Sequence, residues 1–395
     1  MSSPWWSHEG LEVHEGRLRV AGRDAESLAR EHGTPLYVYD TARVQANLCR
    51  LQAALERARL RHRLLFALKA NRHPGVLARL RSTGTVGIDA CSPNEVDLVL
   101  ESGWKAEEIS FTGTCLSRRD LARILPHPLL LNLDSLSAIR QVGERDPGRA
   151  IGLRLNPRVG AGYAARFTYA GDKPTKFGIY PDQVEQALEE ARRHDLRVRG
   201  LHFHVGSGWL QEGLGSFLEA ARRVAEMARR IQELEYINVG GGIGGCLQES
   251  EQAPDLDEYA GGIARHLGPL GATIFFEPGD FLVRDAGVIL VQVVGVDEKG
   301  GQIFVGVDCG SNAYNAVAFY QIPQEVVLCR AADAPPGITC TIAGHINEAG
   351  DIFAERCRLP ELREGDILAL LNAGGYGAAM ASQHCYRPHA LEIAL

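Results

Sequence analysis

The stretch Leu64-Leu65-Phe66-Ala67-Leu68-Lys69-Ala70-Asn71 decides the fold of this chain, because it is an apolar strand that delivers a single lysine to its end. An apolar run of this length is typical of a buried strand. Burial at the strand end would desolvate the Lys69 ammonium, lower its pKa and make the amine a nucleophile for carbonyl carbons. The alternative is a lysine that lies along a barrel rim with its charge in water. The other motifs of the chain are needed to distinguish these two interpretations.

The same kind of strand recurs between residues 36 and 283, where short β-type runs alternate with amphipathic helical stretches. The expected strands are 36–39, 64–68, 85–89, 109–112, 129–133, 151–155, 201–205, 236–239 and 273–276. Strands that alternate with helices of this length form parallel β/α units, and about eight such units make a (β/α)₈ barrel. We therefore predict an α/β fold with a TIM barrel over residues 36–283. An open, doubly wound sheet is the alternative.

After residue 283 the sequence changes to short apolar or alternating runs separated by Gly, Pro and Asp turns. These runs are 288–296, 302–307, 325–329, 338–342, 366–371 and 390–394. This pattern predicts a C-terminal antiparallel β-barrel or sheet domain over residues 284–395. Residues 1–35 also contain strand-like runs, and we expect these N-terminal strands to join that second domain.

Composition narrows the class of protein. The formal net charge of −7 argues against nucleic acid or an anionic membrane as the main partner. The nine cysteines form no C-x-x-C pair, so we predict neither a metal site nor a disulfide framework. The N-terminal residues lack the pattern of a signal peptide, and no run of 18 apolar residues occurs, so we expect a cytoplasmic protein.

Chemistry in a TIM barrel lies at the carboxyl ends of the strands, and polar residues of this chain gather there. They are Lys69, Asp89, Arg154, His204, Gly240, Gly241, Gly242 and Glu277. Consecutive glycines let backbone N–H groups approach a phosphate, although a tight turn explains them equally well. A histidine beside a Gly-Ser turn is placed to stack on a planar ring, and a structural strand histidine is the alternative. A buried glutamate needs a partner, and a pyridinium N–H is a suitable one.

Taken together, these motifs resemble the fold-type III, alanine-racemase-like decarboxylases that use pyridoxal 5'-phosphate (PLP), the group of diaminopimelate and ornithine decarboxylases. The resemblance covers nearly the whole chain. It implies that Lys69 forms the Schiff base with PLP, that His204 stacks on the ring, and that Glu277 pairs with the pyridine nitrogen. It implies further cofactor contacts from Asp89, Arg154, Ser207, Gly240, Gly241, Gly242, Gly279 and Tyr376. It also implies a homodimer whose active sites are shared between the subunits.

Three departures from the family pattern concern the substrate. Where the family has a cysteine that protonates the carbanion left by CO₂, this chain reads Asn347-Glu348-Ala349-Gly350-Asp351. Asparagine is not a general acid at physiological pH, so we expect the proton from Lys69, His345 or water. The arginine expected after Glu277-Pro278-Gly279 is Asp280, and a later carboxylate-binding arginine is absent from Tyr314-Asn315-Ala316. Without both arginines a distal carboxylate lacks its bidentate clamp. Pairing of Asp280 with Arg284 on the barrel rim is the alternative.

We therefore predict a PLP-dependent carboxy-lyase that decarboxylates an amino acid or amino-acid derivative, conjugated or carrier-linked, through the Lys69 Schiff base and a quinonoid intermediate. The substrate is not expected to be meso-diaminopimelate. The predicted catalytic residues are Lys69, His204, Glu277 and Asn347, and the predicted substrate contacts are Asp280, Tyr314, His345, Glu348, Asp351 and Tyr376. The alternatives are a racemase on the same fold, decarboxylation coupled to transamination or oxidation, a non-catalytic PLP carrier and a regulatory homologue.

Overall fold

Eight parallel strands close into a barrel in the computed structural model, which describes residues 3–163, 168, 169, 171 and 173–395. The strands are β5 (His62–Ala67), β6 (Val86–Ala90), β7 (Ile109–Phe111), β8 (Leu130–Leu133), β9 (Ala150–Leu155), β10 (Arg197–Phe203), β11 (Tyr236–Asn238) and β12 (Thr273–Phe276). The barrel closes where β12 pairs with β5. The predicted TIM barrel is confirmed, and the open sheet is excluded.

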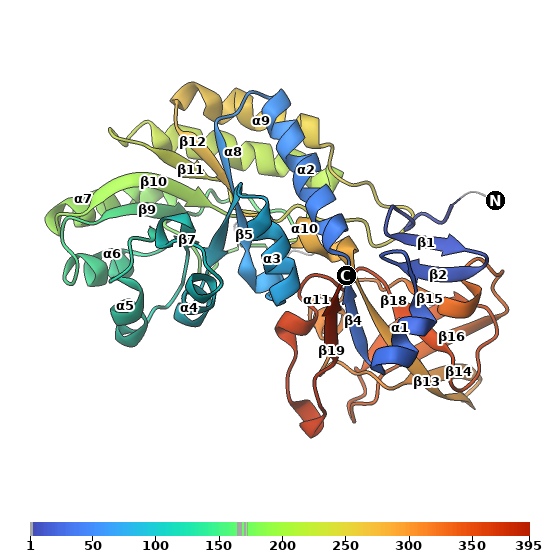
Figure 1. The fold of residues 1–395 in the computed structure, drawn as a ribbon. Helices are drawn as coiled ribbons and strands as arrows, with labels where there is room; N and C mark the ends of the chain where they lie inside the picture. The colour runs from blue at the N-terminus through green and yellow to red at the C-terminus, as the bar shows by residue number, and fades with distance from the viewer. Residues whose placement is uncertain (1–2, 164–167, 170, 172) are drawn as a thin grey trace.

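Helices cover the outside of the barrel, most of them connecting consecutive strands and the first and last flanking β5 and β12 (Figure 1). They are α2 (Thr41–Arg57), α3 (Pro74–Ser82), α4 (Pro93–Glu101), α5 (Arg118–Ile124), α6 (Leu136–Gly143), α7 (Val184–Arg193), α8 (Leu214–Ala228), α9 (Leu256–Leu267) and α10 (Asp280–Val283). Capping residues in the local sequence set where these helices begin. In α4, for example, Ser92 accepts a hydrogen bond from the Glu95 N–H, and Pro93 occupies the first helical position.

The interior of the barrel is filled by aromatic and amide side chains below the strand ends. Tyr236 stacks on Phe275 with 4.8 Å between ring centroids, and its hydroxyl donates to Asn132 Oδ1 at 2.9 Å. Gly200 makes room for this ring, because a Cβ there would lie 2.0 Å from Tyr236 Cζ. The interior is therefore packed rather than hollow, and space for a ligand is left at the carboxyl ends of the strands.

Strand β4 (Leu36–Tyr39) is not part of the barrel, and the prediction that it forms the first β/α unit is wrong. It pairs antiparallel with β13 (Gly287–Lys299) and parallel with β19 (Leu391–Ala394). The following helix α2 packs on α3 and α9 of the barrel. A strand followed by a helix has the same local pattern in either place, so periodicity alone did not separate them. The domain limits of 36–283 against 1–35 and 284–395 stay a prediction.

The second domain is built on a mixed sheet of eight strands. Besides β4, β13 and β19 it contains β14 (Gln302–Val307), β15 (Val326–Leu328), β16 (Ile338–Ala343), β17 (Ile352–Leu359) and β18 (Ile367–Leu370), with α11 (Ala316–Tyr320) between β14 and β15. The expected antiparallel β-barrel is corrected here, because β14–β16 and β4–β19 are parallel pairs. The long connection through α11 and β15 allows β16 to return in the direction of β14.

The N-terminal strands form a separate three-stranded sheet that shares a core with the mixed sheet. They are β1 (Leu11–His14), β2 (Arg17–Val20) and β3 (Arg23–Asp24), and helix α1 (Ala25–His32) follows them. Leu18 and Leu28 pack in one buried cluster with Val288 and Leu290 of β13. The expectation that the N-terminal strands join the second domain is confirmed by this shared core.

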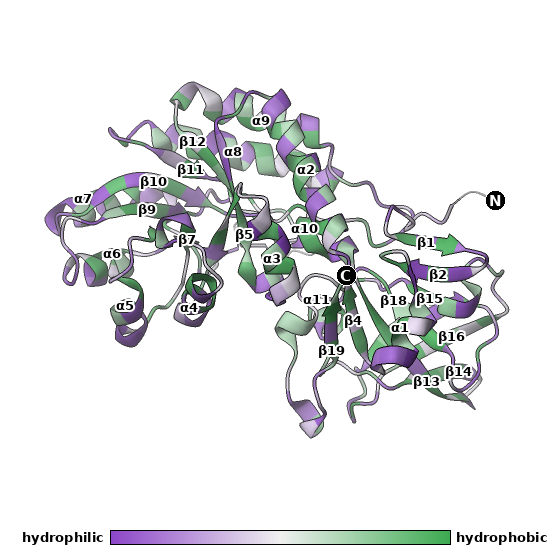
Figure 2. Ribbon diagram, viewed as in Figure 1, coloured by the Kyte–Doolittle hydropathy of each residue, from purple (hydrophilic) through white to green (hydrophobic). Residues whose placement is uncertain are grey.

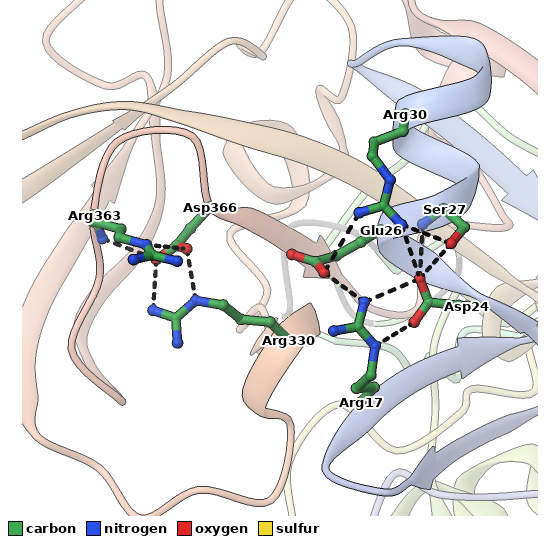
Figure 3. Close-up of polar contacts among 8 residues, drawn as sticks. All are labelled: Arg17, Asp24, Glu26, Ser27, Arg30, Arg330, Arg363 and Asp366. Atoms are coloured by element: carbon green, nitrogen blue, oxygen red, sulfur yellow. Dashed lines mark hydrogen bonds and ion pairs between the residues drawn. The ribbon is translucent and has the colours of Figure 1, made fainter.

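Two clusters of ion pairs lie in this domain (Figure 3). Asp24 caps α1 by accepting the Ser27 N–H, and it also pairs with Arg17 at 2.7 Å. The hydrogen bond from Arg17 lowers the pKa of Asp24 to about 2. A second cluster joins Asp366 to Arg330 at 2.7 Å.

Hydrophobic residues concentrate in the strands: β4 and β5 are largely green, whereas α7 is largely purple (Figure 2). Within the described ranges, no helix combines the length and the apolar character needed to cross a membrane.

Candidate active site

A cavity of about 290 Å³ opens at the carboxyl ends of the barrel strands. Most residues predicted to bind the cofactor line it, namely Lys69, Asp89, Arg154, His204, Ser207, Gly241, Gly242, Glu277, Gly279 and Tyr376. Asp280 lines it as well. Gly240 does not, and its N–H donates to Asn238 Oδ1 at 2.9 Å. Seven different strands end at this cavity or beside it, so the fold gathers residues that lie up to about 300 positions apart.

Lys69 projects into the cavity from the short turn Leu68–Ala70 that follows β5. The Lys69 side chain is 46% exposed, and its Nζ lies 3.4 Å from Asp89 Oδ2 on the neighbouring strand β6. Burial works to lower the pKa of Lys69, but the charges of Asp89 and nearby acidic groups outweigh it and raise that pKa above its ordinary value. The prediction that desolvation lowers the Lys69 pKa is therefore wrong for this structure, because an acidic neighbour compensates the burial.

Glu277 follows β12 and is held by three donors from three other strands. His202 Nε2 lies 3.0 Å from its Oε2, whereas Asn238 Nδ2 and Ser110 Oγ donate to Oε1 at 2.5 and 3.3 Å. Burial alone would raise the pKa of Glu277, but His202 and the other partners lower it to about 2. The carboxylate is therefore ionised, and Oε2 keeps capacity for one more donor.

His202, which also lines the cavity and contacts Glu277, is not among the predicted site residues. It is 2% exposed, and burial lowers its pKa, so the imidazole is neutral. A neutral ring that donates from Nε2 to Glu277 leaves Nδ1 without a proton, and Nδ1 has no partner among the described residues. The strand alternation that puts His202 and His204 on one face was the available signal, since a buried glutamate needs such a donor.

His204 lies one step further along the same face and reaches the cavity. Its Nδ1 accepts the Gly241 N–H at 3.3 Å, and burial lowers its pKa well below the ordinary value. The ring of Tyr169 lies 4.8 Å away between centroids, tilted by 59°. A neutral imidazole fixed by a backbone donor is suited to face a planar ring, in agreement with the place predicted for His204.

The glycine-rich loop packs against the backbone of its neighbours. A Cβ at Gly241 would lie 2.1 Å from Glu277 O, and one at Gly242 (φ +100°) would lie 2.0 Å from Gly206 O. Only glycine allows this close approach. Gly241 and Gly242 thus form a cavity wall without side chains, against which a phosphate can lie, while the N–H groups of Gly240 and Gly241 already donate to Asn238 and His204.

Two tyrosines reach the cavity from the second domain. Tyr376 has a left-handed backbone (φ 57°), and its N–H donates to Ala70 O at 2.8 Å, beside Lys69. Tyr320 of α11 also lines the cavity and lies 6.1 Å from Tyr376 between ring centroids. Tyr320 was not predicted, because nothing in its local sequence distinguishes it from a core aromatic residue.

Asp280 is buried and paired. Its Oδ2 accepts hydrogen bonds from Arg284 Nε and from Tyr163 Oη, the latter at 3.1 Å. Burial lowers the pKa of Arg284, but the Asp280 charge outweighs it and raises that pKa. The pairing with Arg284 that the sequence left open is thus present, and the role of Asp280 as a substrate contact stays a prediction.

The remaining predicted substrate residues are not brought to this cavity. Tyr314 is 1% exposed and donates to Gln324 at 2.9 Å, so its ring belongs to the core of the second domain. Asp351 accepts the N–H groups of Ser311 and Ile346, which makes it an organiser of the β16–β17 connection.

That connection also carries His345, Asn347 and Glu348. His345 Nε2 lies 3.4 Å from Asn312 Oδ1, and Glu348 Oε1 lies 3.0 Å from His384 Nε2. Both contacts are made with other residues between 284 and 395, and none of the three residues lines the cavity with Lys69 in one chain.

The cavity residues fit PLP. Asp89 Oδ1 is buried with no partner among the described residues, Glu277 can accept one more donor, and the glycine loop forms a wall that side chains would fill. An amine, a buried ionised carboxylate, a neutral imidazole and a glycine cradle are the groups that a phosphorylated pyridine aldehyde requires. The fold and this cavity define a pyridoxal-dependent enzyme.

Known proteins agree with this class. Residues 41–284 match the family model "Pyridoxal-dependent decarboxylase, pyridoxal binding domain". The chain is 33% identical to the diaminopimelate decarboxylase of Methanothermobacter thermautotrophicus, over 97% of this chain and 92% of that protein. It is 32% identical to the diaminopimelate decarboxylase of Escherichia coli K12, over 93% and 91%. The structure of Helicobacter pylori diaminopimelate decarboxylase complexed with L-lysine superposes with a TM-score of 0.86 and 29% identity, covering 94% and 93%.

The chain belongs to the pyridoxal-dependent decarboxylase family. It is accordingly a PLP-dependent carboxy-lyase of the amino-acid type.

Proposed function

We propose that this protein binds PLP through Lys69 and decarboxylates an amino acid other than meso-diaminopimelate. The observation that supports it most is the pair of groups at the strand ends, the Lys69 amine in the cavity and the ionised Glu277 held by His202. The family shares the chemistry, while the substrate is inferred from residues in which this chain departs from the family.

PLP, when bound, supplies an aldehyde that condenses with amines and a ring that accepts the electron pair left by CO₂. Lys69 is the amine in position for that condensation, and Asp89 beside it keeps the amine charged until a proton is removed. Glu277 offers Oε2 to a ring N–H and keeps it protonated, because its own pKa lies near 2. His204 lines one wall of the cavity, where it limits the movement of a bound ring.

The substrate preference follows from the charges in the cavity. Asp280 lies where the family resemblance expects an arginine, and the Asp280 carboxylate is occupied by Arg284 and Tyr163. At position 280 a distal carboxylate of a substrate would therefore meet an acidic group instead of the expected arginine. Asn347, in place of the expected cysteine, leaves the proton for the product to Lys69, His345 or water.

Decarboxylation of meso-diaminopimelate is the second candidate. It is supported by the whole-chain identity of 32–33% to proteins named for that reaction. The homodimer, the cytoplasmic location and the individual roles of the site residues stay predictions under either candidate.

The test is a panel of L- and D-amino acids that includes meso-diaminopimelate, L-lysine, L-ornithine and L-arginine. Purified protein with PLP is incubated with each compound, and CO₂ and product mass are measured. We expect CO₂ release with a substrate other than meso-diaminopimelate.

Each other outcome selects an alternative. L-lysine from meso-diaminopimelate selects the second candidate. Inversion without CO₂ indicates a racemase, and a keto or aldehyde product indicates coupled transamination or oxidation. PLP binding without turnover of any compound contradicts the enzymatic proposal and favours a carrier or a regulatory homologue.

A further inference from the structure

Arg284 has a free donor inside the molecule. Its side chain is 3% exposed, its Nε donates to Asp280, and its Nη1 is buried without a hydrogen-bond partner in the part of the chain that the structure describes. Buried polar groups are nearly always paired, so an unpaired guanidinium nitrogen indicates a place for an acceptor. Arg284 lines the same cavity as Lys69, where a bound ligand can provide that acceptor.

Contacts connect Arg284 to the side of the cavity that carries Ser207 and the glycines. The guanidinium carbon lies 5.6 Å from the centroid of the Tyr163 ring. That ring covers Gly208, where an added Cβ would lie 1.9 Å from Tyr163 Cζ. The Tyr163 N–H in turn donates to Ser207 O at 3.0 Å. Arg284 therefore lies beside the residues that the family resemblance assigns to phosphate.

Asp280 explains the position of this cation. Residues 280 and 284 are one helical turn apart, so their side chains are neighbours. Asp280 Oδ2 holds Arg284 through Nε alone, and neither Asp280 Oδ1 nor Arg284 Nη1 has a hydrogen-bond partner among the described residues, so the pair is not a bidentate fork and Nη1 stays available. A planar guanidinium with free N–H groups is the preferred side chain for phosphate oxygens.

We propose that Arg284, oriented by Asp280, is the cationic donor for the phosphate of bound PLP. The inference rests on the proposed function, because it requires PLP in the cavity. Asp280 is then a positioning residue. With Arg284 bound to Asp280 and to the phosphate, Arg284 is not available as a clamp for a second substrate carboxylate.

The test compares the wild type with the neutral pair Asp280→Asn/Arg284→Gln, which removes both charges and leaves no lone buried ion. Dissociation constants are measured for PLP and for pyridoxal, which lacks the phosphate. We expect the PLP constant to rise about tenfold or more, since a charge-assisted hydrogen bond is lost, while the pyridoxal constant stays the same. In ³¹P NMR of the holoenzyme, the variant signal shifts between about pH 6 and 8, where a free phosphate titrates, and the wild-type signal does not.

A matched control is Arg43→Gln/Asp285→Asn. These residues form a similar ion pair that lines the neighbouring cavity but not the one with Lys69. The control should leave both dissociation constants unchanged. If the neutral pair fails to fold, the exchange Asp280→Arg/Arg284→Leu, which moves the cation to the family position, should bind PLP as the wild type does and show a constant ³¹P signal.

The inference is overturned if the neutral pair binds PLP as tightly as the wild type, or loses PLP and pyridoxal affinity equally. It is also overturned if the control pair shows the same selective loss, or if the exchange variant binds PLP about tenfold more weakly. A wild-type protein that binds no PLP contradicts the proposed function itself. The two failures are thus distinguished by the wild-type titration.

Discussion

The cavity at the barrel mouth brings its predicted site residues together within one chain, whereas the β16–β17 connection does not. At the barrel mouth, residues from separate strands converge, and Glu277 alone receives hydrogen bonds from three of them. In the β16–β17 connection, the hydrogen bonds of Asp351, Glu348 and His345 go to other residues of the second domain. The cofactor half of the predicted site is therefore assembled within a single chain, whereas the substrate half is not.

Strand ends and connections constrain the position of a side chain to different degrees. A strand end in a closed barrel has a fixed direction, so its side chain meets those of its neighbours. A connection between antiparallel strands has no such constraint, and its polar residues satisfy themselves locally unless another surface covers them.

The largest expected effect is that of Lys69→Ala. It removes the amine from the cavity and should lower decarboxylation by at least about 10³-fold. The visible absorbance of lysine-linked PLP should disappear with it. Absorbance spectra and CO₂ release check both, and a spectrum like that of the wild type would show that Lys69 does not hold PLP.

The next effect tests whether a partner subunit completes the site. Lys69→Ala and Glu348→Ala proteins, each inactive alone, are unfolded together and refolded as a mixture. Because half of randomly formed dimers are mixed and each carries one intact shared site, about a quarter of wild-type activity should return.

The matched control for this mixing is Lys69→Ala with Glu277→Gln, whose two positions lie in the same cavity. No activity should return there, because both defects affect the half that one chain builds. Absence of recovery in the Lys69→Ala and Glu348→Ala mixture would mean that the β16–β17 connection does not act across subunits.

A smaller effect, about tenfold on kcat, is expected for His202→Phe, which keeps a ring but removes the donor to Glu277. His202 lowers the pKa of Glu277, so its loss should raise that pKa. Activity on the acid side should then fall at a higher pH than in the wild type. The pH profile of kcat measures this, and an unmoved acid limb would show that His202 does not tune the carboxylate.

The smallest effect lies far from the cavity. Asp24→Ala removes the cap of α1 and the partner of Arg17, and it should lower the free energy of unfolding by about 1 kcal/mol near pH 7 without changing kcat. The pKa of Asp24 is depressed to about 2, so this stabilisation is present above pH ~4 and is lost as the pH falls toward 2. Urea unfolding at several pH values checks it.

Glu15→Ala is the control for Asp24→Ala, since the Glu15 side chain is 84% exposed in the turn between β1 and β2. It should change the free energy of unfolding by less than about 0.5 kcal/mol. A loss of kcat in Asp24→Ala would mean that the N-terminal sheet influences the cavity.

The sequence was sufficient for the barrel because each β/α unit repeats the same local pattern. It failed at β4, whose pattern is identical but whose partners lie more than 200 residues away. It also missed β17, because Glu355, Arg356 and Arg358 interrupt the apolar alternation of an exposed strand. The parallel pairing of β14 with β16 depends on a crossover and was not visible in either strand.

The candidate site divides in the same way. Lys69 and Glu277 were predictable, because each follows an apolar strand, where a charged side chain needs a partner or a ligand. The donors Asn238 and Ser110 were not, because each lies within a strand and reaches Glu277 only when the barrel closes. Arg284 was considered only as a partner of Asp280, and its free Nη1 became visible only in three dimensions.

The pairing of β4 with β19 has a consequence for how the protein is made. The Thr41 hydroxyl that begins α2 donates to Leu395 O, across 354 positions of sequence. During translation, every β/α unit has emerged from the ribosome before this seam can close, and until then β4 exposes an unpaired, apolar edge. Nascent chains arrested before residue 391 should therefore be held by chaperones more strongly than released ones.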